Sequence, residues 1–450
     1  MVEKKWLKAK ADAIRKADKI DPALYRKYNV KRGLRNDDGT GVLVGLTTIG
    51  NVHGYVMNEG EKQPIPGELY YRGINVKDIV AADRREHRFG YEETAYLLLF
   101  GELPAARELV DWKNKIGAYR KLSDGFRDNA IMKHPSKDIM NALARAVLFA
   151  YAFDPEGNPD DMSLEKCLEQ SIDMIGSIPT IAAYAYQAKA HYHDGASLMI
   201  RNPDPKKSTS ENILMLTRED GKYTKLEAET LDLALILHAE HGGGNNSSFT
   251  THVVTSALSD VYSSIAASVL SLKGSRHGGA NLRVKRQMEE IKANVKSWHK
   301  SAEVVKYLEK IADKKAGDCT GLIYGLGHAV YTISDPRAQM LKAKAEALAK
   351  EKGREAEMRL YELIESEGPG IIKARHPAAA DVCANVDLYS GFVYDMLGIP
   401  TDLYTPLFAV ARCVSWCAHR MEELVNQGPI IRPAYKPIFH PRDYVRLSDR

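Results

Sequence analysis

The sequence predicts a mostly helical protein of two domains, with a few short strands near the N-terminus. At 450 residues the chain exceeds the length at which a single hydrophobic core usually keeps growing. Residues 41–74 are the only stretch rich in β-prone residues and punctuated by glycine, as in VLVGLTTIG and ELYYRGI. From Tyr91 onward, most segments show the clustered apolar residues of helices.

The helical segments differ in their surroundings. Residues 3–28 alternate charged and spaced apolar side chains, which predicts a solvent-exposed helix laid against the body of the protein. YEETAYLLLFGELP predicts a helix that ends at its Gly-x-Leu-Pro, and MNALARAVLFAYAF predicts a buried one. Residues 201–212 predict a polar loop. Residues 338–364 are rich in Ala, Lys and Glu, so we expect a surface helix in a separate layer and a smaller domain around 280–390.

Composition and charge exclude several classes of protein. With 44% hydrophobic and 27% charged residues, the chain is expected to fold rather than stay disordered. A formal charge of +4 is too small to predict nucleic acid or an anionic membrane as the main partner. No apolar run approaches a membrane span, and the N-terminus has the composition of neither a secretion signal nor a transit peptide. We therefore expect a cytoplasmic protein.

The five cysteines are odd in number, widely spaced and without a CxxC pair. This pattern predicts reduced, buried thiols rather than a zinc or redox site. Cys413 and Cys417 lie four residues apart, so on a helix they share one face, as core residues do. The chain also lacks a P-loop, a GxSxG elbow and a complete GxGxxG, so nucleotide hydrolysis and serine-hydrolase chemistry have no motif to support them.

His238 and His241 end an apolar helical stretch and are followed at once by three glycines. Glycines let a backbone approach a ligand closely, and a histidine on such a turn can donate a hydrogen bond to an anion. Taken alone, the pattern also fits structural histidines at a capped helix end. A metal site is a weaker alternative, because HxEH is not the HExxH zinc pattern.

Three further positions have the residue types of acid–base chemistry. His277 lies between glycines in LKGSRHGGAN, and His328 follows a Gly-x-Gly turn in YGLGHAVYTISDPR. Asp387 lies between two apolar residues in NVDLYSG. Burial there would raise its pKa from about 3.9 and make it a better base near neutral pH.

Arginines near or after these positions are candidates for anion binding. Arg337 lies nine residues after His328, beside a proline. Arg412 and Arg432 lie in apolar or proline-rich surroundings. A guanidinium in such surroundings usually needs a carboxylate or phosphate partner.

Taken together, these blocks resemble a known family. HAEHGGGN, GSRHGGAN, GLGHAVYTISDPR and NVDLYSG, followed by PLFAVARCVSWCAHRMEE and IIRPAY, are similar to the consecutive signature blocks of citrate synthases. The resemblance runs from about Leu69 to Tyr435 and is strongest after Leu233. It implies a mostly helical homodimer, in which residues 1–277 and 393–450 form a large domain and residues 278–392 a small domain that closes over the active site.

The implied activity is that of an acyltransferase in the tricarboxylic acid cycle. Acetyl-CoA condenses with oxaloacetate in a Claisen reaction, and hydrolysis of the thioester gives citrate and CoA. By this resemblance Asp387 removes a methyl proton, His277 binds the thioester oxygen, and His328 polarises and protonates the ketone. The residues expected to bind oxaloacetate are His241, Arg337, Arg412 and Arg432, the last one in the neighbouring subunit's site. The resemblance implies no metal and no cofactor, since acetyl-CoA is a substrate.

The CoA half of the site departs from the family pattern. Family members often carry Arg or Lys shortly after the GH-x-V block, where this chain has Tyr331 and Thr332. The candidates for the CoA phosphates are therefore Lys273, Arg276, Lys373 and Arg375, the last two in the segment IIKARHP.

Two alternatives remain open at this point. A 2-methylcitrate synthase would use propionyl-CoA with the same residues, and one methylene changes selectivity by only about 1–3 kcal/mol. A non-catalytic metabolite- or metal-binding protein on the same scaffold is the second alternative. Release of CoA thiol with oxaloacetate distinguishes an enzyme from such a protein.

Overall fold

The computed structural model describes residues 4–59, 61–154, 158–275, 277–298, 300–377 and 381–450, and the chain divides into two units, Met1–Leu46 and Thr47–Arg450. The first unit contains α1 (Lys4–Ala17), α2 (Pro22–Lys27) and a short 3₁₀ helix, η1 (Arg32–Leu34). The expectation of one helix over residues 3–28 was wrong. Asp21 accepts a hydrogen bond from the Ala23 amide at 2.9 Å, and Pro22 follows it. Proline is tolerated at the first position of a helix but not in its interior, so a second helix begins there.

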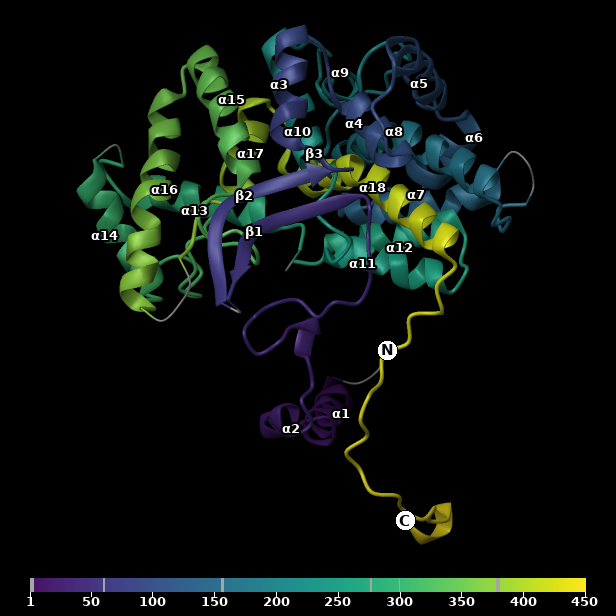
Figure 1. The fold of residues 1–450 in the computed structure, drawn as a ribbon, viewed down its shortest axis with the longest axis vertical. Helices are drawn as coiled ribbons and strands as arrows, with labels where there is room; N and C mark the ends of the chain where they lie inside the picture. The colour runs from purple at the N-terminus through teal and green to yellow at the C-terminus, as the bar shows by residue number, and fades with distance from the viewer. Residues whose placement is uncertain (1–3, 60, 155–157, 276, 299, 378–380) are drawn as a thin grey trace. The chain divides into compact units, whose positions relative to one another are not determined.

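The second unit begins with the predicted strands, β1 (Gly50–Asn58), β2 (Glu61–Tyr71) and β3 (Ile74–Asn75). They form an antiparallel sheet in the order β1-β2-β3, with Gly50 opposite Tyr71 (Figure 1). Two glycines allow this hairpin to lie against residues 330–334. A Cβ at Gly67 would lie 2.2 Å from the Ser334 carbonyl oxygen, and one at Gly54 would lie 2.8 Å from that of Val330. Any other residue would push the sheet away from this segment.

The rest of the described second unit is largely helical. Its first helices, including short 3₁₀ and π turns, are α3 (Val76–Glu86), α4 (Tyr91–Phe100), α5 (Ala106–Tyr119), α6 (Asp124–Phe126), η2 (Arg127–Met132), α7 (Ile139–Ala150), η3 (Tyr151–Phe153), α8 (Leu164–Asp194), α9 (Thr209–Thr217), α10 (Lys225–His238), α11 (Asn246–Ser256) and α12 (Val261–Lys273). The later ones are α13 (Ala280–Asn294), α14 (Ser301–Ala312), α15 (Pro336–Lys352), α16 (Glu355–Arg375), α17 (Val386–Met396), η4 (Thr401–Leu403), α18 (Tyr404–Asn426) and η5 (Leu447–Asp449).

Helix α18 forms the centre of the hydrophobic core. Nearly all of its side chains from Tyr404 to Arg420 are buried, and it packs against α4, α8, α10, α11 and α12. Its sequence is mainly apolar from Tyr404 to Ala418, as expected of a helix enclosed by others, and its buried polar side chains include Arg412. Cys413 and Cys417 lie within this core, as their spacing predicts, and Cys167 and Cys383 are also buried. Cys319 is exposed, so the expectation of burial was wrong for that one residue.

Helices α13 to α17 pack against one another and gather on one side of the second unit (Figure 1). This is the region in which the sequence predicts a smaller domain, and its boundaries at residues 278 and 392 stay a prediction. The helix expected over residues 338–364 is divided, because Gly353 adopts a φ of +66° and ends α15 before α16 begins.

The polar segment 201–212 is a loop only as far as Ser208. Ser208 and Glu211 form a reciprocal cap that starts α9 at Thr209, so the end of the segment is helical.

None of the helices in the described part of the chain combines the length and the apolarity that a membrane crossing requires.

Candidate active site

The turn after α10 places His241 beside the charged centre of the second unit. Gly242 follows with a φ of +83°, which turns the chain sharply, and the buried Tyr71 hydroxyl donates to the carbonyl oxygens of Ile236 and Glu240 at 2.9 and 3.2 Å. Burial lowers the pKa of His241 well below its usual value, and the nearby positive charge of Arg337 lowers it further. His241 is therefore neutral. Its buried Nε2 has no hydrogen-bond partner among the described residues.

Arg412 is a fully buried cation on α18. Its Nε donates to the His238 carbonyl oxygen at 2.7 Å, which fixes the guanidinium plane at the end of α10. Burial lowers the pKa of Arg412 to about 10, so the group is still charged at neutral pH. Both terminal nitrogens are buried without a hydrogen-bond partner among the described residues. An unpaired buried guanidinium is costly, which indicates that these nitrogens bind an anion such as a carboxylate.

Arg337 is the second buried cation and lies in the first turn of α15. Asp335 caps this helix, and its carboxylate accepts hydrogen bonds from the Arg337 Nε at 3.0 Å and Nη2 at 2.8 Å. Burial opposes the charged form of Arg337, but the carboxylate of Asp335 more than offsets this and raises the pKa above its usual value. The Arg337 Nη2 also lies 3.5 Å from the Nε2 of His328. Asp335 therefore holds the guanidinium beside His328.

His328 has a defined tautomer. Its Nδ1 accepts the backbone N–H groups of Val330 at 3.1 Å and Tyr331 at 3.0 Å, so the ring proton lies on Nε2. The 3.5 Å approach of Arg337 is then a contact between two donors and not a hydrogen bond. The imidazole stacks on the Tyr331 ring with centroids 4.6 Å apart, and its centroid lies 5.1 Å from that of His241. The Nε2–H of His328 is thus a positioned proton donor.

Hydrogen bonds from the backbone and side chain of Asn385 tie the loop that carries His328 to the start of α17. The Asn385 amide donates to the Gly325 carbonyl oxygen at 2.9 Å, and its side-chain Nδ2 donates to that of Gly327 at 2.8 Å. Gly325 and Gly327 both have positive φ values, +88° and +93°, which L side chains rarely adopt. The Asn385 Oδ1 also caps α17 by accepting the Asp387 N–H at 3.0 Å.

Asp387 lies in the first turn of α17 among apolar neighbours. Burial raises the pKa of its carboxyl to about 6, although the positive charge of Arg337 acts in the opposite direction. This is the direction that its sequence surroundings predict. Such a carboxyl group is largely ionised at neutral pH and is a stronger base than an exposed aspartate.

His277 lies just beyond the C-terminal end of α12. Its Nε2 is 3.2 Å from the Ser247 Oγ, which also accepts a hydrogen bond from the Trp416 Nε1 of α18 at 3.2 Å. Burial lowers the pKa of His277 to about 4, with a further contribution from the positive charge of Arg412. His277 is therefore a neutral hydrogen-bonding group at physiological pH.

The remaining candidates are Arg432, for oxaloacetate, and Lys373 and Arg375, for the CoA phosphates. Arg432 lies in the extended segment after α18 with its side chain exposed, and the Ile431 amide beside it donates to the Ser256 Oγ at 3.1 Å. Lys373 lies 3.1 Å from Asp381, and the Arg375 Nε lies 2.6 Å from Asp313. A CoA phosphate would have to compete with these carboxylates.

Lys273 and Arg276 are the other two candidates for the CoA phosphates. Lys273 pairs with Asp138 at 2.9 Å. Arg276 lies outside the described residues.

Sequence reasoning missed the residues that position the others, namely Asp335, Asn385, Ser247 and Tyr331. Two of them had a local signal. Asp335 before Pro336 and Asn385 before an apolar run are both helix N-caps. Tyr331, noted only because it replaces a basic residue, is fully buried beneath His328. Ser247 gave no signal, because its contact with His277 joins residues 30 positions apart.

The chain is similar in sequence to the members of one protein family. The sequence model of the family described as "Citrate synthase, C-terminal domain" matches residues 38–434. The citrate synthase of Haloferax volcanii is 34% identical over 373 residues, covering 82% of this chain and 88% of that protein. The citrate synthase of Synechocystis sp. is 34% identical over 396 residues, covering 85% of this chain and 88% of that protein.

The fold is also similar to those of solved citrate synthase structures. The crystal structure of citrate synthase from Pyrobaculum aerophilum matches with a TM-score of 0.75 at 30% identity, over 91% of this chain and 94% of that one. The citrate synthase of the archaeon Thermoplasma acidophilum, in a ternary complex with carboxymethyl coenzyme A and oxaloacetate, matches with a TM-score of 0.76 at 28% identity, over 94% of this chain and 99% of that one.

Proposed function

The chain belongs to the citrate synthase family and is an acyltransferase of that type, and we propose that it condenses acetyl-CoA with oxaloacetate and water to give citrate and CoA. The observation that carries this proposal is the buried pair of cations. Arg412 presents two unpaired terminal nitrogens, and Arg337 is held beside His328. Two guanidinium groups and the neutral His241 suit a small dicarboxylate. Oxaloacetate is such a molecule, and its ketone would then lie near the Nε2–H of His328.

The first chemical step is assigned to Asp387. Its carboxylate takes a proton from the methyl group of acetyl-CoA, and the electron pair of the C–H bond moves towards the thioester carbonyl to form an enol or enolate. The Ser247 hydroxyl donates to the Asn245 Oδ1 at 3.0 Å in this structure; when it turns to donate to the Nε2 of His277 instead, the ring proton lies on Nδ1, which then donates to the thioester oxygen. Loss of one such donor typically costs about 2.7–4 kcal/mol in transition-state stabilisation.

The second step joins the two carbon skeletons. The enol carbon attacks the oxaloacetate ketone, and the Nε2–H of His328 protonates the ketone oxygen as it becomes a hydroxyl group. Water then hydrolyses the thioester of citryl-CoA and releases citrate and CoA. We propose that this chemistry needs no metal or further cofactor. Closure of residues 278–392 over the substrates would exclude water until the carbon–carbon bond has formed.

The experiment that tests this function measures the release of CoA thiol in the presence of oxaloacetate, with acetyl-CoA and propionyl-CoA compared at equal concentration. We expect a higher kcat/KM with acetyl-CoA. A preference for propionyl-CoA would identify a 2-methylcitrate synthase instead. An absence of thiol release with both substrates, from protein that binds oxaloacetate, would leave a binding protein as the remaining explanation.

We further propose that the protein acts in the cytoplasm as a homodimer that shares its active sites. The exposed Arg432, in a proline-containing segment beyond the core, supports this assembly. An extended segment of this kind can reach across a two-fold axis and supply its arginine to the partner's oxaloacetate.

A further inference from the structure

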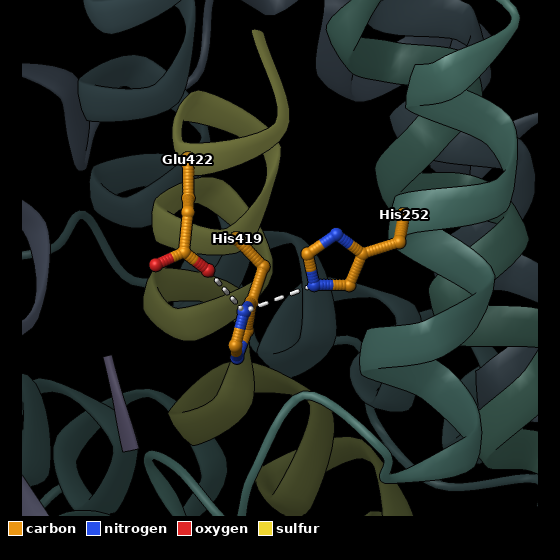
Figure 2. A group of neighbouring side chains, drawn as sticks. All are labelled: His252, His419 and Glu422. Carbon is orange, nitrogen blue, oxygen red and sulfur yellow. Dashed lines mark hydrogen bonds and ion pairs between the residues drawn. The ribbon is translucent and has the colours of Figure 1, made fainter. Parts of the chain in front are cut away.

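A second group of titratable side chains lies between α11 and α18 and is not used in the proposed chemistry. His252 of α11 points towards His419 and Glu422 of α18 (Figure 2). The His252 Nε2 lies 3.2 Å from the His419 Nδ1, which lies 3.6 Å from the Glu422 Oε2. His419 and Glu422 are three residues apart on one helix, so their side chains share a face. The three donor atoms lie within 4.8 Å of one another.

In each imidazole of this group, the ring nitrogen that faces away from the other imidazole contacts a carboxylate. The His252 Nδ1 lies 2.8 Å from the Glu423 Oε2, and the His419 Nε2 lies 3.2 Å from the Glu240 Oε2. Histidines that bind metals almost always donate their second ring N–H to a carboxylate, a carbonyl or water, which orients the ring and raises its basicity. Here both rings have that support at once, with the opposite nitrogens turned towards the same point.

The distances between the donor atoms match a tetrahedral metal site. Zinc bonds to histidine nitrogen and carboxylate oxygen are about 2.0–2.2 Å long, which sets neighbouring ligands of a tetrahedron roughly 3.4 Å apart. The two measured separations, 3.2 and 3.6 Å, lie on either side of that value. Three protein ligands would leave the fourth position for water.

Glu422 provides an independent indication. Its Oε1 accepts hydrogen bonds from the amide and hydroxyl of Thr48, at 2.6 and 2.9 Å. The Oε2 is buried and accepts no hydrogen bond from the described residues, although it forms a 3.6 Å ion pair with the His419 Nδ1, and the side chain is only 9% exposed. A buried carboxylate oxygen normally accepts a hydrogen bond, so this one can still take a ligand closer than the His419 nitrogen.

The glycines that follow His241 lie next to His252 and His419. A Cβ at Gly243 would lie 3.4 Å from the His419 Cε1 and 3.6 Å from the His252 Nε2. The absence of a side chain at this position leaves room beside the two imidazoles. The charges that face the group are the carboxylates of Glu240, Glu422 and Glu423 and, near the first two of these, the guanidinium of Arg72. Arg412 is the other cation close to Glu240.

We propose that the His252 Nε2, the His419 Nδ1 and the Glu422 Oε2 bind a divalent transition-metal ion of the zinc class, which ties α11 to α18 beside the turn that carries His241. The ion takes the place of the proton shared by the two facing ring nitrogens, and that proton passes to solvent. Nitrogen and oxygen donors at tetrahedral spacing select zinc and similar ions over calcium or magnesium, which prefer six or more oxygen ligands. Its role is structural, since no step of the condensation uses it.

The test uses the full-length chain without a polyhistidine tag, treated with a chelator and titrated with cobalt(II) chloride. We expect one cobalt ion per chain, with the intense visible bands of a four-coordinate site, and displacement of this ion by zinc. The same titration on His252→Gln and on Glu422→Gln should give no such bands. His134→Gln is the matched control, because His134 is exposed and lies outside the group, and it should bind cobalt as the wild type does.

A further variant removes support from the site and leaves all three ligands in place. Glu423→Gln should weaken cobalt binding by about 10- to 100-fold, the usual effect of losing a carboxylate behind a metal-bound histidine. Circular dichroism of each metal-free variant checks its fold. Absence of a stoichiometric cobalt complex in the folded wild type would overturn the proposal. So would binding that is unchanged in folded His252→Gln or Glu423→Gln.

Discussion

Asp387→Asn is expected to abolish turnover and, at the same time, to make the protein more stable at neutral pH. Burial holds the carboxyl pKa at about 6 in the folded chain, against an ordinary value of 3.8. One pKa unit corresponds to about 1.4 kcal/mol, so the ionised side chain costs the fold up to about 3 kcal/mol above pH 6. Asparagine has nearly the same shape and no charge, and therefore avoids this cost.

The sign of the pH dependence follows from the raised pKa. Between pH 3.8 and about 6 the folded protein keeps a proton on Asp387 that the unfolded chain has lost, so the cost is absent well below pH 3.8 and grows as the pH rises to about 6. The stability difference between Asp387→Asn and wild type should therefore be about 3 kcal/mol at pH 8 and about half of that at pH 5. Urea denaturation at both pH values, analysed with a common m-value, measures this difference.

Asp395→Asn, on the same helix, is the matched control. The Asp395 carboxylate is paired with Lys285 and Arg354, and these partners lower its pKa despite partial burial, so its loss should destabilise the protein. If Asp387→Asn were as destabilising as Asp395→Asn at pH 8, the carboxylate of Asp387 would not be held in an unfavourable environment. The account of its basicity would then be refuted.

Three further outcomes are expected. With Asp387 as the base, kcat/KM should fall about tenfold per pH unit below pH 6, and a rate that stays flat to pH 4.5 would contradict the assignment. Arg337→Ala should weaken oxaloacetate binding, measured by calorimetry, while His277→Ala should leave that binding intact and lower turnover by about 10²- to 10⁴-fold. For the shared site, Asp387→Ala and Arg432→Ala chains, each inactive alone, should recover roughly a quarter of wild-type activity after subunit exchange, since half of the dimers are mixed and each of these has one intact site. No recovery, with mixed dimers confirmed by mass spectrometry, would place Arg432 in its own subunit's site.

Local sequence was sufficient to predict most of the fold. The sheet begins at Gly50, within the β-prone segment 41–74, and the apolar stretches form buried helices, because period and composition act over a few residues. The errors lie at helix ends. Residues 3–28 and 338–364 each contain a stop signal, Asp21–Pro22 in one and Gly353 in the other, that was outweighed by strong helix propensity on both sides.

The candidate site was predicted only in part from the sequence. His241, His328 and Asp387 lie in recognisable blocks, whereas their surroundings depend on contacts between distant residues. The pairing of His252 with His419 joins positions 167 residues apart, and no spacing rule within either helix reveals it. The family resemblance implies no metal and no local motif indicates one, and the donor set proposed here exists only after α11 and α18 have packed together.

The link that Asn385 makes between Gly327 and the start of α17 has a consequence for any opening and closing of the enzyme. It connects the loop that carries His328, the proposed proton donor, to the helix turn that carries Asp387, the proposed proton acceptor. If residues 278–392 move as one body, both groups move with it and keep their positions relative to each other. Their mutual alignment is then set when the chain folds and not anew in each turnover. Arg337 lies in the same range of residues and would move with them, so such a movement would change their distance to Arg412 on α18.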